Sequence, residues 1–227
     1  MTSMKGHRRK QLMAGRKTSG HNRGMFMAYS PKMDADLIIL GDLEFIHWAT
    51  ELETNPSVVA YRFDEDVDVS VDEDDADNFI KLRGIWVESR DGAVALHQIN
   101  PNEKLDADRK SIRILYRLND HVVRQAQLVS ITYAYLSLVA YQLDFWLKVI
   151  AMASQVRSYV LENEIELVGT HVQLMKEGTI RSLLEGVDIP DQALALGAIC
   201  RLIITGSIQV EVGKDGFGYN TVWSRHD

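Results

Sequence analysis

The chain has 227 residues, of which 46% are hydrophobic and 25% are charged, and it contains one cysteine. This composition is typical of a globular protein with one large or two small domains, and the single cysteine excludes an internal disulfide. The apolar run over residues 129–149 is too polar to span a membrane, and the N-terminus lacks the apolar core of a signal peptide. We therefore expect a cytoplasmic protein in which Cys200 is a buried packing residue.

Charge is distributed unevenly along the chain. The net charge of −7 combines +7 in the first 24 residues with −14 in the other 203. The basic residues of the first segment are Lys5, Arg8, Arg9, Lys10, Arg16, Lys17 and Arg23. The segment has no apolar period, so it reads as a flexible arm. Its charge suits DNA phosphates, although a tail with no particular role is the alternative.

The first half of the chain predicts short strands around a helix. Extended segments are expected at residues 25–29 and 36–40. Asp42 is a candidate N-cap for a helix that ends near Thr54 and exposes Glu44, Glu51 and Glu53, and residues 57–63 alternate as a strand. Residues 64–77 contain nine acids and no base, and they lack the pattern of a calcium-binding loop. We predict a solvated acidic loop there.

The next segments predict an α/β domain over residues 25–150. Residues 82–89 and 93–99 flank Asp91-Gly92, a strong hairpin signal. Residues 111–118 fit either a strand or a helix, Asp120 is a candidate cap for a helix through residue 128, and residues 129–138 read as a buried strand. Residues 142–163 have helical spacing without a breaker and predict one long helix. Mixed strands with flanking helices are the expected architecture.

Residues 151–227 predict a winged-helix domain. Residues 172–184 are helical, Asp191 caps a second helix over residues 192–204, and strands are expected at residues 207–212 and 219–223. The candidate recognition helix has only Arg201 as a base, and the wing has only Lys214. The sequence leaves open whether this module binds DNA or instead binds protein or packs within the chain.

The order of these parts resembles the TnsA family over about residues 23–223. The resemblance is carried by the basic leader, the segment GDLEFIHWATELETNPSVVAYRF, the hairpin at Asp91-Gly92 and the C-terminal winged-helix pattern. TnsA proteins are the endonuclease subunits of heteromeric, TnsABC-type transposases and cleave the non-transferred strand at transposon ends. The resemblance implies a restriction-endonuclease-like domain whose site has a helical Glu, a strand Asp and a Gln/Glu-x-Lys around magnesium.

This resemblance predicts a degenerate site. The helical Glu corresponds to Glu44, the Asp to Gly84, and the Gln-x-Lys to Gln98-Ile99-Asn100. Gly84 offers no carboxylate, and Asn100 carries no positive charge at neutral pH. Two of the four groups that would stabilise the transition state are therefore missing, and we predict a vestigial nuclease site without a cofactor.

A rearranged site is the alternative. Glu88 lies four residues after Gly84 and so faces the same side of a strand, where it could hold Mg²⁺ together with Glu44 and Gln98. His97 or Lys104 could replace the lost lysine, although His97 points to the face opposite Gln98.

Three functions follow from these alternatives. In the first, the chain is a non-catalytic transposase subunit that binds transposon-end DNA through its arm and docks on a catalytic subunit or an AAA+ ATPase. It could form a homodimer, or a heterodimer with an active paralogue. In the second, it is an active magnesium-dependent DNA endonuclease. In the third, it is a winged-helix regulator that binds a partner protein. No membrane partner is expected.

Overall fold

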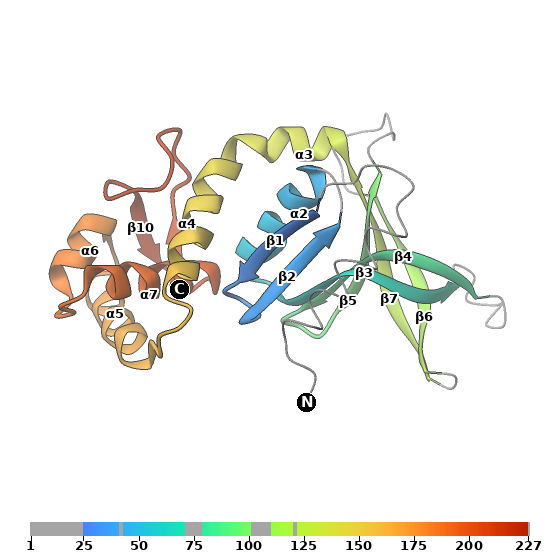
Figure 1. Cartoon of the computed structure of the whole chain (residues 1–227), viewed down its shortest axis with the longest axis horizontal. Helices are drawn as coiled ribbons and strands as arrows, with labels where there is room; N and C mark the ends of the chain where they lie inside the picture. Colours follow the sequence, from blue (N-terminus) through green and yellow to red (C-terminus); the bar gives the residue numbers. More distant parts are fainter. Residues whose placement is uncertain (1–24, 41–42, 71–78, 101–109, 120–121, 227) are drawn as a thin grey trace.

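The protein is a mixed α/β structure with a central sheet and flanking helices, which confirms the predicted α/β class (Figure 1). The computed structural model describes residues 25–40, 43–70, 79–100, 110–119 and 122–226. The basic arm, the candidate caps Asp42 and Asp120, and Lys104 lie outside the described residues.

The central sheet is a closed barrel of five strands. The strands are β3 (Val58–Ser70), β4 (Ile80–Ser89), β5 (Val94–Asn100), β6 (Lys110–Asn119) and β7 (Val122–Thr132), in the order β3-β4-β5-β7-β6. The pair β5–β7 is parallel and the other pairs are antiparallel. The hairpin predicted at Asp91-Gly92 is confirmed as the β4–β5 turn.

Side-chain alternation gives the barrel two apolar faces. The inner face is filled by Val69, Trp86, Leu96, Ile114, Tyr116 and Ala126, with contributions from all five strands. The outer face carries Ile85, Val87, Val129 and Ile131. Helices α2 (Leu43–Thr54) and α3 (Tyr133–Val139) cover this outer face through Trp48, Leu52 and Leu136. Residues that are neighbours along one strand therefore belong to different cores.

Three predictions in this half were wrong. In the segment predicted as an acidic loop, residues 64–70 are instead the end of β3, where Val67 and Val69 turn inward and Asp66 pairs with Arg83 at 2.9 Å. Residues 71–77 of that segment lie outside the described residues. Residues 122–128 are strand rather than helix because they pair with β6 along most of its length. Residues 133–138 are helical, and Thr132 caps that helix by accepting a hydrogen bond from the Tyr135 backbone N–H.

The N-terminal hairpin lies between the barrel and the C-terminal helices (Figure 1). Strands β1 (Met25–Ser30) and β2 (Ala35–Leu40) pair in antiparallel register, as expected for the two extended segments. Arg157 reaches this hairpin from the C-terminal side, with Nη1 at 3.5 Å from Oδ1 of Asp36.

The C-terminal half has its own core. After the short 3-10 turn η1 (Ala140–Gln142) come α4 (Leu143–Gln155), α5 (Glu162–Met175), β8 (Glu177–Thr179), α6 (Ile180–Gly186), α7 (Gln192–Ile204), β9 (Ile208–Val210) and β10 (Val222–Arg225). The strands form a sheet in the order β8-β10-β9. Phe145 and Val149 of α4 belong to this core, so the boundary predicted at residue 150 falls inside α4.

Two helix predictions in this half were too long and one was confirmed. The helix expected over residues 142–163 ends at Gln155, because the chain turns where Val156 packs against Gly197 of α7. The helix expected over residues 172–184 is divided into α5 and α6 by β8. The helix over residues 192–204 is confirmed, and Asp191 caps it by accepting from the Ala193 backbone N–H at 2.8 Å.

One helical run among the described residues, Tyr133–Gln155, has the length and apolar composition to cross a membrane. It comprises α3, η1 and α4, and it contributes Phe145, Val149 and Ala153 to the C-terminal core. Core helices of water-soluble proteins pass the same test of length and composition, so this run is only weak evidence for a membrane span. The cytoplasmic location stays a prediction.

Candidate functional site

The helical glutamate of the predicted site lies on the outer side of the barrel. Glu44 is in the first turn of α2 and is half-buried. Helix α2 packs through Trp48 and Leu52 onto the face that carries Ile85 and Val87. Any partner of Glu44 on β4 would therefore have to lie on the same strand face as Ile85 and Val87.

Gly84 lies at a point where β4 and β5 approach closely. A Cβ atom built on Gly84 would lie 2.8 Å from the carbonyl oxygen of His97 and 2.8 Å from Cδ1 of Leu96. Both distances are shorter than real Cβ contacts, and the first is to backbone held in the ladder that pairs Ile85 with His97. A side chain at the position that corresponds to the metal-binding aspartate would therefore require the β5 backbone to shift.

The other predicted ligands are engaged in local contacts. Gln98 donates from Nε2 to the carbonyl oxygen of Arg83 at 3.2 Å. Oε1 of Glu88 accepts from the indole N–H of Trp86 at 2.9 Å and lies 3.5 Å from Nη2 of Arg62. Glu88 is therefore tied to its own strand and to its neighbour β3.

The structure does not bring Glu44, Glu88 and Gln98 together. Glu88 shares its strand face with Trp86, which points into the barrel, whereas α2 lies on the outer face. Glu88 and Gln98 are also separated along the β4–β5 ladder by about four residues, or roughly 13 Å. Within the described ranges, no three His, Cys, Asp or Glu side chains are grouped so as to hold a metal ion. The three predicted ligands therefore do not form one magnesium site in the described part of the chain.

Comparison of the chain with models of known protein families and with curated proteins gives no match. Function is therefore inferred from the geometry of this chain.

A cavity of about 290 Å³ lies beneath α2, and it is lined by polar side chains that the sequence analysis did not assign to one site. Its lining includes Glu51, His97, Ser111 and Gln127 beside the indole of Trp48. His97 is 7% exposed, and its Nδ1 accepts from the Trp48 indole N–H at 3.1 Å. In the neutral ring the proton is then on Nε2, so His97 can donate but not accept at that atom. As predicted, His97 faces away from the side of β5 that carries Gln98.

Glu53 was predicted on the surface of α2 and is instead buried, at 2% exposure. Its carboxylate accepts from the hydroxyls of Ser30 and Tyr61, both at 2.6 Å, and from the Lys32 backbone N–H at 2.7 Å. Burial, followed by the Glu53 charge, raises the pKa of Tyr61 well above its ordinary value. The carboxylate ties the N-terminal hairpin to α2 and β3, which is a structural role.

Lys32 completes this cluster at the end of α2. Its ammonium group donates to the carbonyl oxygens of Leu52 at 2.8 Å and Asn55 at 2.6 Å, at the carboxyl end of the helix, where the helix dipole favours a cation. Burial lowers the pKa of Lys32 to about 8, against the opposing effect of Glu53.

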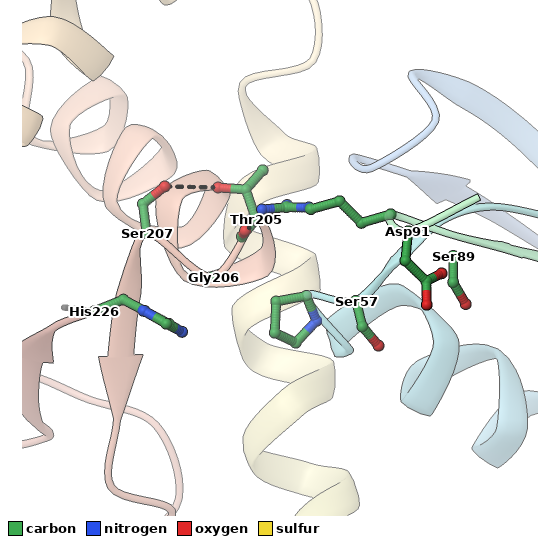
Figure 2. Close-up of a pocket in the computed structure, with 9 residues that line it drawn as sticks. Ser57, Ser89, Asp91, Thr205, Gly206, Ser207 and His226 are labelled. Carbon is green, nitrogen blue, oxygen red and sulfur yellow. Dashed lines mark hydrogen bonds between the residues drawn. The ribbon is translucent and has the colours of Figure 1, made fainter. Parts of the chain in front are cut away.

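A larger cleft of about 710 Å³ separates the barrel from the C-terminal half. Figure 2 shows Ser57, Ser89 and Asp91 on the barrel side, and Thr205, Gly206, Ser207 and His226 on the other. Arg90 spans the cleft, donating from Nη2 to the carbonyl oxygen of Thr205 at 3.2 Å. The cleft therefore lies where the β4–β5 turn meets the end of α7.

The candidate recognition helix α7 is a core helix. Seven of its residues are buried, and α4, α5 and α6 surround it through Val149, Val168 and Leu183. Arg201 is half-buried, and its Nε lacks a hydrogen-bond partner among the described residues. A helix with seven of its 13 residues buried has little surface left to enter a DNA groove, which favours the packing or protein-binding alternative.

Proposed function

We propose that this chain is a non-catalytic, TnsA-like subunit of a heteromeric transposase. It holds transposon-end DNA through its basic arm and docks on a catalytic subunit or an ATPase. The observation that carries the non-catalytic part is the close approach at Gly84. The backbone of β5 lies where the side chain of a metal-binding aspartate would begin, at 2.8 Å from its Cβ.

The order of elements supports the finer fold within this proposal. Helix α2, with Glu44, precedes the hairpin β4–β5, the order that the resemblance implies for a restriction-endonuclease-like domain. In the C-terminal half, α6, a turn and α7 are followed by β9 and β10, which pair in antiparallel register. This is the winged-helix order of helix, turn, helix and hairpin. Because α7 is covered, this module is assigned to protein contacts.

Charge supports the DNA-holding part. The arm contributes +7 to a chain whose other 203 residues carry −14, so the favourable interaction with phosphates is concentrated in one segment. If all seven basic residues contact phosphates, the logarithm of the binding constant falls with the logarithm of salt concentration with a slope of about −6.

The test combines cleavage and binding. The full chain is incubated with supercoiled plasmid and with a transposon-end duplex in Mg²⁺ or Mn²⁺, alone and with candidate partner subunits. We expect no nicking by the isolated chain, together with salt-sensitive DNA binding that is lost when residues 1–24 are removed.

The controls distinguish the alternatives. Nicking by the wild-type chain that disappears in Glu44→Ala and Glu88→Ala would establish an active, rearranged site and refute the non-catalytic proposal. DNA binding that survives removal of the arm would refute the role of the arm. If the chain neither cuts nor binds DNA, the remaining function is that of a protein-binding regulator.

A further inference from the structure

Helix α5 carries two exposed leucines on the side that faces away from its own core. The inner side packs through Val168 and Val172, which are 0% and 2% exposed. On the outer side, Leu167 is 47% exposed and Leu174 is 74% exposed. Exposed leucines one heptad apart are typical of a helix that packs against a second helix.

The outer residues of α5 follow the spacing of a coiled-coil seam. Asn163, Leu167, Thr170 and Leu174 are separated by four, three and four residues, the alternation of a and d positions. All four line one groove of about 520 Å³, whose opposite wall is the α6–α7 connection at Gly186, Val187 and Asp188. We call these four residues the α5 seam. It extends over about 17 Å, or three helical turns.

The rim of the groove is acidic. Glu166 and Asp188 line it together with His171, and in the described part of the chain no lysine or arginine does. A second copy of the chain seated here would place Glu166 and Asp188 of both copies in the same groove, and this repulsion disfavours self-association. A partner with lysine or arginine beside its apolar residues would complement both features.

We infer that the groove along α5 is a docking site for an amphipathic helix of a partner protein, with apolar residues at heptad spacing and basic residues at the flanking positions. The inference rests on the proposed function in one respect, that the partner is a protein of the same assembly. It does not require the chain to bind DNA. It also gives the C-terminal module a role in which α7 remains buried.

The probe is a synthetic three-heptad peptide with leucine at a and d and lysine at e and g, whose like charges oppose its own pairing. Its binding to the full chain is measured by fluorescence anisotropy, beside a peptide with glutamate at e and g. We expect the lysine peptide to bind about 10-fold more tightly at low salt, with a difference that falls as salt is added.

Variants locate the site. Leu174→Asp is expected to weaken binding of the lysine peptide by about 10-fold or more, because it places a charge in the apolar seam. Leu138→Asp is the matched control, since Leu138 is 59% exposed on α3, outside the groove, and it should leave binding unchanged. Glu166→Lys should shift preference toward the glutamate peptide. Circular dichroism and thermal melting verify that each variant is folded.

Several results would overturn the inference: no binding of the lysine peptide, equal binding of both peptides, or binding unaffected by Leu174→Asp. A concentration-dependent dimer abolished by Leu174→Asp would assign the groove to a second copy and would also overturn it. DNA binding is measured on the same samples. Loss of DNA binding with peptide binding intact would refute the DNA-holding role and leave the docking site standing, whereas the reverse would refute the docking site alone.

Discussion

Gly84 is the position where a single substitution tests the reasoning most directly. Replacing it by aspartate restores the residue expected of an active TnsA-like site. In this structure the new Cβ would lie 2.8 Å from the His97 carbonyl oxygen and 3.0 Å from Cγ of Leu96. The carbonyl belongs to the β4–β5 ladder and cannot move without disturbing the pair Ile85–His97. We expect loss of stability and no gain of cleavage.

The magnitude follows from two contributions. Inserting a Cβ into a closed site typically costs about 1–3 kcal/mol, which Gly84→Ala should show alone. Aspartate adds the cost of a carboxylate beside a carbonyl oxygen and the side chain of Leu96, for a total of about 3–5 kcal/mol. For a chain of this size, each kcal/mol lowers the melting temperature by about 2–4 °C.

The assay is thermal and urea unfolding of both variants beside a glycine control. Gly169 lies within α5, and a Cβ built there meets nothing within 4 Å. Gly169→Ala should therefore stabilise the protein slightly, by up to about 1 kcal/mol, through helix propensity. If Gly84→Asp melted with the wild-type chain, or gained metal-dependent nicking, the position would be open and the non-catalytic proposal would lose its main support.

Three further predictions concern the contacts around the N-terminal hairpin and the cleft. Tyr61→Phe removes the hydroxyl that donates to Glu53 at 2.6 Å, and it should lower the free energy of urea unfolding by about 1–3 kcal/mol. Tyr116→Phe is the control, because its ring is also buried, and it should change this free energy little. Equal effects of the two substitutions would refute the role of the Glu53 cluster. Lys32 has a folded-state pKa lowered from 10.5 to about 8, so the unfolded chain binds more protons between these pH values and stability should rise with pH in this window. The difference in unfolding free energy between wild type and Lys32→Met isolates this effect, because the raised pKa values of Tyr61 and Cys200 are common to both proteins. If this difference did not change from pH 8 to 10.5, the role of Lys32 would be contradicted. In Gly206→Ala, alanine would have to adopt a φ of 80°, with its Cβ only 2.4 Å from Cβ of Pro56. The substitution should therefore lower the free energy of unfolding by about 1–3 kcal/mol and increase proteolysis between the two halves. A variant that melts and is digested like the wild type would show that this contact is dispensable.

The predictable elements were those with strong local signals. The β4–β5 hairpin was predicted from Asp91-Gly92, and α7 from its apolar run and the cap at Asp191. The elements predicted wrongly have local preferences that long-range pairing overrides. Arg124 and Gln125 favour a helix in isolation, yet they lie on β7 because β6 pairs with that strand. The acids at residues 64–70 are tolerated in a strand because Asp66 faces solvent and pairs with Arg83, while Val67 and Val69 face inward.

In the candidate site, too, local features could be predicted and long-range relations could not. The absence of an aspartate at position 84 and of a lysine at position 100 could be read directly from the sequence, because residue identity and spacing from the Asp91-Gly92 turn are local properties. Three relations required the folded chain: the β5 backbone crowds a side chain at Gly84, Glu88 and α2 belong to opposite faces of the barrel wall, and His97 and Glu51 line one cavity. These relations depend on strand register and barrel closure, where a shift of one residue moves every side chain to the other face.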